Sequence, residues 1–127
     1  MNKAVYDTRF FMELYYSNDR ETIKRIKQEK NRRERYISAA VIYEVYKLTL
    51  AREGREIAKI KVADLRDGFE VIPVSDQIAE FSAELSHKYN LSMGDSIIAA
   101  TAAMLNAVCL SDDPHFQQIT EIKTAWI

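Results

Sequence analysis

The 127-residue sequence has little of several residue types that mark specialised chemistry or irregular structure. One cysteine, Cys109, excludes an internal disulfide, and its apolar neighbours predict a buried side chain rather than a nucleophile. Because only His87 and His115 accompany it, a structural zinc site is not expected. Three glycines and two prolines argue against a flexible linker, so we expect one domain over residues 1–127.

The sequence also lacks long apolar runs and a strong excess of charge. No segment approaches the roughly 20 apolar residues of a membrane span, and residues 1–10 contain no signal-peptide core. We therefore expect a cytoplasmic protein without membrane contact. The formal net charge is −1, which argues against broad attraction to nucleic acid. Any RNA contact must come from local patches or from bound cations.

What the sequence does contain is an alternation of strand-like and helical segments. Strand-like runs cover residues 3–6, 35–37, 69–72, 107–110 and 122–126. Helical patterns cover residues 9–16, 21–30, 39–53, 55–66, 76–89 and 93–106, with a short last helix from Pro114. Expected capping residues are Asn18, Ser38, Gly54, Ser75, Ser92 and Asp113. The alternation predicts an α/β fold in which helices cover both faces of a parallel sheet.

Residues 24–35 form a basic run with seven basic and two acidic side chains, a local charge of 7 − 2 = +5. One interpretation is a solvated helix end and turn. The other is a patch that contacts an RNA backbone. The sequence leaves both open.

Two carboxylates lie within predicted helices among apolar neighbours. Asp95 carries the only formal charge in residues 91–111 and shares a helix face with Ile98 and Ala102. Capping by Ser92 and Asp95 is a sufficient explanation for this acid alone. Glu44 lies too deep in its helix for a cap, so it needs a partner, either a buried cationic side chain or a metal ion.

Two further acids follow predicted strands. Asp7 follows residues 3–6, while Asp112 and Asp113 follow residues 107–110. Each taken alone is explained by turn or capping chemistry. Together, Asp7, Glu44, Asp95 and Asp113 are expected at the carboxyl edge of one sheet, where open α/β folds place their sites. Four such acids repel one another, and Mg²⁺ or Mn²⁺ is the oxygen-seeking counter-ion expected there.

The order and spacing of these motifs resemble the PIN domain family, in particular VapC-like toxins of toxin–antitoxin pairs. The motifs are Asp7-Thr8, the helical Glu44, the segment 93–100 (MGDSIIAA) and the segment 111–116 (SDDPHF). The resemblance spans almost the whole chain. It implies a three-layer α/β/α fold with a five-stranded parallel sheet.

The resemblance also implies a function, a metal-dependent endoribonuclease that forms a homodimer and is silenced by a cognate antitoxin. It assigns the catalytic and metal-binding roles to Asp7, Glu44, Asp95 and Asp113. Ser111 stands where the family usually has Thr, and its hydroxyl can still orient a carboxylate. Arg9 replaces a small polar residue, so it either binds substrate phosphate or pairs with an acid. Asp112 is the alternative to Asp113 if the alignment shifts by one.

Five apolar or aromatic side chains follow Asp7 within seven positions, which is more than one helix face holds, so some are expected to be available to a partner. They are Phe10, Phe11, Leu14, Tyr15 and Tyr16. A receiver domain and a phosphoaspartate hydrolase are disfavoured, because Asp7 has neither an acidic neighbour nor an Asp-x-Asp motif. Two alternatives remain. One is a PIN-like interaction module without metal, and the other is an RNA-processing nuclease outside a toxin–antitoxin pair.

Overall fold

The computed structural model describes residues 2–29, 31 and 33–127. Its strands are β1 (Lys3–Tyr6), β2 (Glu34–Ser38), β3 (Glu70–Ile72), β4 (Val108–Leu110) and β5 (Lys123–Ala125). They form one sheet in the order β3–β2–β1–β4–β5, and every neighbouring pair is parallel. The predicted α/β class with a five-stranded parallel sheet is therefore confirmed.

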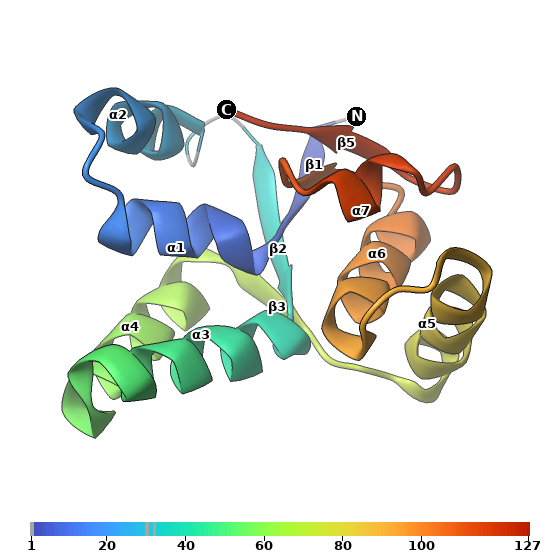
Figure 1. Ribbon diagram of the computed structural model, residues 1–127, viewed down its shortest axis with the longest axis horizontal. Coiled ribbons are helices and arrows are strands. Elements are labelled where there is room, and N and C mark those ends of the chain that lie inside the picture. The colour runs from blue at the N-terminus through green and yellow to red at the C-terminus, as the bar shows by residue number, and fades with distance from the viewer. Residues whose placement is uncertain (1, 30, 32) are drawn as a thin grey trace.

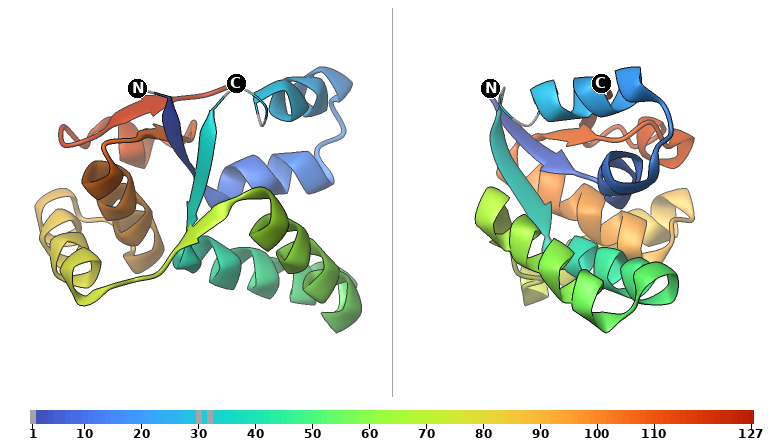
Figure 2. Two further views of the ribbon diagram at one scale, coloured as in Figure 1. Left: turned by 180° about the vertical axis from the view of Figure 1, so that it is seen from behind. Right: turned by 90° about the vertical axis from the view of Figure 1, so that its left-hand side faces the viewer.

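Helices fill the connections between the strands. They are α1 (Thr8–Tyr16), α2 (Arg20–Glu29), α3 (Ala39–Glu53), α4 (Arg55–Gly68), α5 (Asp76–Tyr89), α6 (Met93–Leu105) and α7 (Pro114–Gln117). Helices α1 to α4 lie on one side of the sheet, and α5 and α6 lie on the other (Figures 1 and 2). Within the described residues, none of the helices has the length and apolarity needed to cross a membrane.

Most helix boundaries follow the predicted capping chemistry. Four predicted caps each accept a backbone N–H from the helix that follows, namely Ser38, Ser75, Ser92 and Asp113. Gly54 ends α3 with a φ of 86°. The predicted cap at Asn18 is wrong, because Asp19 directly precedes α2 and accepts from the backbone N–H of Glu21 at 3.2 Å.

The core lies between the sheet and its helices and includes Cys109, which is fully buried as predicted. On α1, Phe10 and Phe11 are fully buried against this core. Leu14, Tyr15 and Tyr16 are only half-buried. Helix α1 therefore keeps a partly open apolar edge, as its excess of apolar residues predicts.

The basic run at residues 24–35 includes Lys30 and Arg32, which lie outside the described residues. Two of the described cations form short-range ion pairs. Arg25 lies 3.4 Å from Glu21, and Arg33 lies 3.2 Å from the buried Glu29. These pairs neutralise part of the run locally.

A candidate metal centre at the carboxyl edge of the sheet

The site lies where the strand order reverses direction. Strand β1 is central, with β2 on one side and β4 on the other. Tyr6 at the end of β1 pairs with Leu110 at the end of β4, and the backbone N–H of Asp7 donates to the Leu110 carbonyl at 3.2 Å. The residues that follow these two strands therefore meet in the crevice at the carboxyl edge.

Asp7 is buried, with a relative exposure of 4%, and both of its carboxylate oxygens accept hydrogen bonds. Oδ1 accepts from the backbone N–H of Thr8 at 2.7 Å, so Asp7 does cap α1. Oδ2 accepts from the Ser111 hydroxyl at 2.7 Å. Burial raises the pKa of Asp7 from 3.8 to about 6, against the lowering effect of the Ser111 bond, and the charges of Asp95 and Glu44 raise it further.

Glu44 comes from α3, and its half-buried carboxylate accepts a hydrogen bond from the Thr8 hydroxyl at 2.5 Å. Burial raises its pKa, and the negative charge of Asp95 acts in the same direction. Among the described residues Glu44 forms no ion pair, so the structure does not supply the cationic partner considered from the sequence. A side chain at Gly94 would collide with Oε2 of Glu44, which makes the glycine a cradle for this carboxylate.

Asp95 and Asp113 approach from the other side of the crevice. The backbone N–H of Asp95 donates to the Ser92 hydroxyl at 3.2 Å, in agreement with the predicted cap. Burial raises the pKa of Asp95, and the charge of Asp113 raises it further. Asp113 caps α7 by accepting from the backbone N–H of His115 at 2.9 Å. Its own backbone N–H donates to Ser111 Oγ at 3.1 Å, so Ser111 contacts both Asp7 and Asp113.

The four acids predicted from the sequence all line one pocket of about 370 Å³. The other residues in its walls are Thr8, Arg9, Met12, Tyr43, Lys47 and Leu48. The structure therefore brings together side chains that are separated by up to about a hundred positions in the sequence. Capping and site geometry are not alternatives here, because Asp7 and Asp113 do both.

Arg9 lies in the pocket wall but pairs with Asp112. Its Nε and Nη2 donate to the two carboxylate oxygens of Asp112 at 2.5 and 3.1 Å. Asp112 is not among the residues that line the pocket. Of the two roles considered for Arg9, the structure therefore shows pairing with an acid, although with one outside the set of four.

The donor set fits a divalent cation. All four side chains offer hard carboxylate oxygens, which Mg²⁺ and Mn²⁺ prefer. Burial and, to a lesser extent, their mutual repulsion raise the pKa of Asp7, Glu44 and Asp95. Gly94 leaves room for one of them. A cation bound between them would relieve the unfavourable charge.

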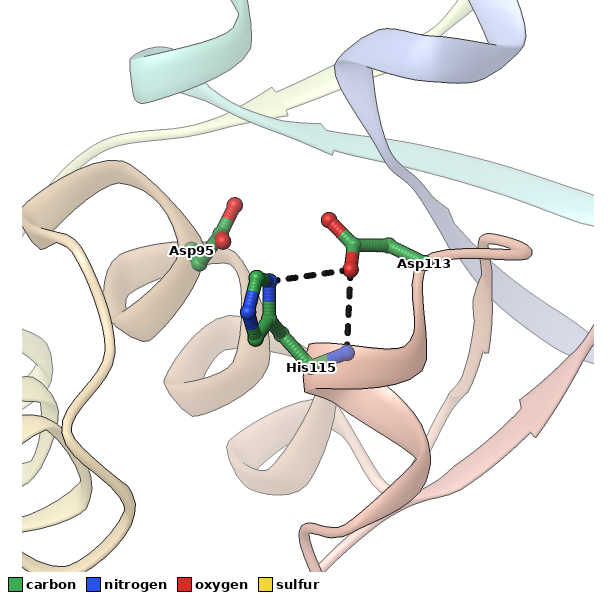
Figure 3. A group of neighbouring side chains, drawn as sticks. All are labelled: Asp95, Asp113 and His115. Atoms are coloured by element: carbon green, nitrogen blue, oxygen red, sulfur yellow. Dashed lines mark hydrogen bonds and ion pairs between the residues drawn. The ribbon is translucent and has the colours of Figure 1, made fainter.

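Three features of the site were not found from the sequence. Gly94 gave no signal, because its contact with Glu44 joins two helices. Lys47 on the pocket wall gave none either. His115 was considered for a structural zinc site, which was not expected. It is exposed, yet it lies beside two of the acids. One ligand atom each from Asp95, Asp113 and His115 lies within 4.8 Å of the others (Figure 3).

The sequence matches the PIN domain family over residues 4–122. The chain belongs to the PIN domain family. PIN relatives are nucleases, which are hydrolases, and PIN nucleases generally use divalent metal ions. The resemblance inferred from the sequence motifs is thus confirmed. No curated protein matches the sequence.

Solved structures of toxin–antitoxin systems share the fold. A chain of a toxin–antitoxin complex from Klebsiella pneumoniae is 25% identical, with a TM-score of 0.74 over 98% of this chain and 99% of that chain. A chain of DNA-bound VapBC from Salmonella typhimurium is 17% identical, with a TM-score of 0.80 over 99% and 98% of the two chains. VapC20 of Mycobacterium tuberculosis, described as a sarcin–ricin loop cleaving toxin, is 20% identical, with a TM-score of 0.75 over 94% and 98%.

Proposed function

We propose that this chain is a metal-dependent endoribonuclease and the toxin of a type II toxin–antitoxin pair. The observation that carries the proposal is the single pocket lined by Asp7, Glu44, Asp95 and Asp113. Membership of a nuclease family supports hydrolysis of a phosphodiester bond. The Klebsiella pneumoniae toxin–antitoxin complex supports the pairing, and the described action of VapC20 suggests RNA as the substrate.

In this proposal the four acids have two roles, metal binding and orientation of the attacking water. Asp7, Asp95 and Asp113 would hold one or two Mg²⁺ or Mn²⁺ ions. Glu44, whose carboxylate accepts a hydrogen bond from the Thr8 hydroxyl, would add a further ligand or orient the attacking water. A bound divalent ion supplies two effects, a lower pKa for a coordinated water and stabilisation of charge on the reacting phosphate. Hydrolysis by water leaves a 5′-phosphate and a 3′-hydroxyl.

Two cations in the pocket wall are suited to the substrate backbone. Arg9 and Lys47 both line the pocket, and both are exposed. Cationic side chains beside a carboxylate cluster attract the phosphates that flank a scissile bond. Lys47 adds local positive charge that the overall net charge of −1 does not provide, whereas Arg9 shares its guanidinium with Asp112.

A groove of about 490 Å³ between α1 and α4 is the proposed docking site for the antitoxin. Its apolar lining includes Phe11, Leu14 and Tyr15 from α1, the helix whose excess of apolar residues pointed to a partner. Asp64 and Asp67 also line this groove. An amphipathic segment that carries basic residues matches such a surface. Because RNA and an antitoxin would meet this chain in the cytoplasm, we propose that the protein is cytoplasmic.

A homodimer is also part of the proposal. Helices α3 and α4 expose apolar side chains to solvent, with Tyr43 at 65% and Ile60 at 58% relative exposure. Burying such side chains against a second copy would remove apolar surface from water. Sedimentation equilibrium of the purified chain tests this, and a monomer at micromolar concentration would contradict it.

Cleavage of RNA by the purified chain is the deciding experiment. We expect cleavage with Mg²⁺ or Mn²⁺, none with EDTA, and none by Asp95→Asn. We also expect Mn²⁺ to raise the melting temperature of the wild type but not that of Asp95→Asn, because only a metal-binding fold gains stability from the ion.

These measurements separate a non-catalytic module from the proposed nuclease, and an inhibition assay with the product of an adjacent gene separates the other alternative. A non-catalytic PIN-like module would show neither cleavage nor a metal-induced shift. An RNA-processing nuclease outside a toxin–antitoxin pair would cleave RNA, yet no protein encoded by an adjacent gene would bind the chain and inhibit it.

A further inference from the structure

The imidazole of His115 belongs to the same cluster as two of the proposed metal ligands. Its Nδ1 lies 3.0 Å from Oδ1 of Asp113, and ligand atoms of Asp95, Asp113 and His115 lie within 4.8 Å of one another. Figure 3 shows the three side chains facing a common space between α6 and α7. Donors at this mutual distance can contact one ion after small side-chain rotations.

Local structure fixes the position from which this imidazole reaches the acids. Pro114 begins α7, and the carboxylate of Asp113 accepts the backbone N–H of His115. The next residue, Phe116, is fully buried and anchors the short helix in the core. The His115 side chain itself is 67% exposed. It can therefore turn toward an incoming ion without any change in the fold.

A nitrogen donor changes which ion such a cluster prefers. Mg²⁺ is a hard ion that binds oxygen ligands and gives up its water reluctantly. First-row transition ions accept imidazole nitrogen readily, and their order of affinity rises from Mn²⁺ toward Cu²⁺. An imidazole also adds a ligand without adding negative charge to a pocket that already holds four carboxylates.

We propose that His115 is a third ligand beside Asp95 and Asp113 and makes this end of the pocket prefer a transition ion such as Mn²⁺ over Mg²⁺. The proposal rests on the function proposed above and adds the choice of metal to it. It assigns His115 a role that its exposed position on the surface would not indicate.

Calorimetric titration of the full chain, first stripped of metal with EDTA, tests the proposal with Mg²⁺ and Mn²⁺ separately. We expect the wild type to bind Mn²⁺ more tightly than Mg²⁺. His115→Gln should lower the Mn²⁺ affinity about tenfold or more and leave the Mg²⁺ affinity within about twofold. The matched control is His87→Gln, which removes the other exposed histidine, on α5, and should behave as the wild type.

Pulsed electron paramagnetic resonance of the Mn²⁺-loaded chain gives a direct reading of the ligand. A ¹⁴N coupling from directly bound imidazole is expected in the wild type and in His87→Gln and should disappear in His115→Gln. Tight Mn²⁺ binding without that coupling, or equal losses of Mg²⁺ and Mn²⁺ affinity in His115→Gln, would overturn the role of His115 while leaving the nuclease proposal intact. No binding of either ion to the wild type would overturn both.

Discussion

The Ser111 hydroxyl donates a 2.7 Å hydrogen bond to Oδ2 of Asp7, a residue 104 positions earlier in the sequence. The Ser111 hydroxyl oxygen also accepts a hydrogen bond from the backbone N–H of Asp113 at 3.1 Å. One small buried side chain therefore ties the acid after β1 to the acid after β4. This link holds Asp7 and Asp113 together at the carboxyl edge of the sheet.

Ser111→Ala should weaken both metal binding and RNA cleavage. The Ser111 bond lowers the pKa of Asp7, so its loss favours the protonated acid, which binds cations poorly. Losses of second-layer hydrogen bonds around metal ligands typically cost about 10–100-fold in affinity or activity. Ser111→Thr keeps the hydroxyl and is the matched control. Equal losses in the two variants, measured by calorimetry and by cleavage rates, would show that the hydroxyl has no such role.

Asp7→Asn should abolish cleavage and yet stabilise the metal-free protein at neutral pH. The folded-state pKa of Asp7 is about 6, above its ordinary value of 3.8. The contribution of Asp7 to stability is thus complete below 3.8 and is lost as the pH rises through 6. This difference in pKa corresponds to a loss of folding stability on the order of 3 kcal/mol once Asp7 is ionised.

Urea unfolding in EDTA, from about pH 4 to pH 8, measures this effect. The free energy of unfolding of Asp7→Asn should exceed that of the wild type increasingly as the pH rises. The two values should be similar near the acid end of the range. Saturating Mn²⁺ should raise the stability of the wild type at neutral pH and leave that of the variant unchanged, because the ion neutralises the charge of Asp7. Two parallel stability curves would contradict the prediction.

Local chemistry explains why much of the fold was predictable from the sequence. The predicted strands were each placed within one residue at either end, since apolar runs and turn residues mark buried parallel strands locally. Because the end of β1 was predicted correctly, Asp7 could be placed at the carboxyl edge of the sheet. Asn18 was the wrong choice of cap, because Asn18 and Asp19 both suit the position and only the helix start decides between them.

Features that depend on contacts between distant elements could not be predicted. The sequence shows that Glu44 needs a partner, but not that the hydroxyl of Thr8, 36 positions away, is that partner. It shows Gly94 at the start of a helix, but not that α6 approaches α3 so closely there. The position of His115 depends on how α7 turns toward α6, which no local pattern encodes.

Gly94→Ala should reduce cleavage without destabilising the fold. The added Cβ would meet Oε2 of Glu44, and the flexible end of that side chain can move away at little cost. Replacement of glycine by alanine within a helix also favours the folded state by up to about 1 kcal/mol. We therefore expect an unchanged or slightly higher melting temperature and at least a tenfold loss of metal-dependent cleavage, on the order seen when metal ligands are misplaced.

Gly68→Ala provides the matched control for that experiment. Gly68 also lies in a helix, at the end of α4, and nothing lies within 4 Å of the position its Cβ would take. This variant should keep full cleavage. A Gly94→Ala protein as active as Gly68→Ala would mean that the exact position of the Glu44 carboxylate is unimportant.

Asp112 and Asp113 are adjacent acids for which we predict opposite behaviour. Asp113 lines the pocket, whereas Asp112 binds Arg9 through both carboxylate oxygens. Asp113→Asn keeps a good helix cap, so the fold should persist while Mn²⁺ affinity and cleavage are lost. Asp112→Asn removes an exposed ion pair that contributes at most about 1 kcal/mol, and Mn²⁺ affinity should stay near that of the wild type. Calorimetry on both variants decides the assignment, because weak Mn²⁺ binding by Asp112→Asn together with normal binding by Asp113→Asn would transfer the metal-binding role to Asp112.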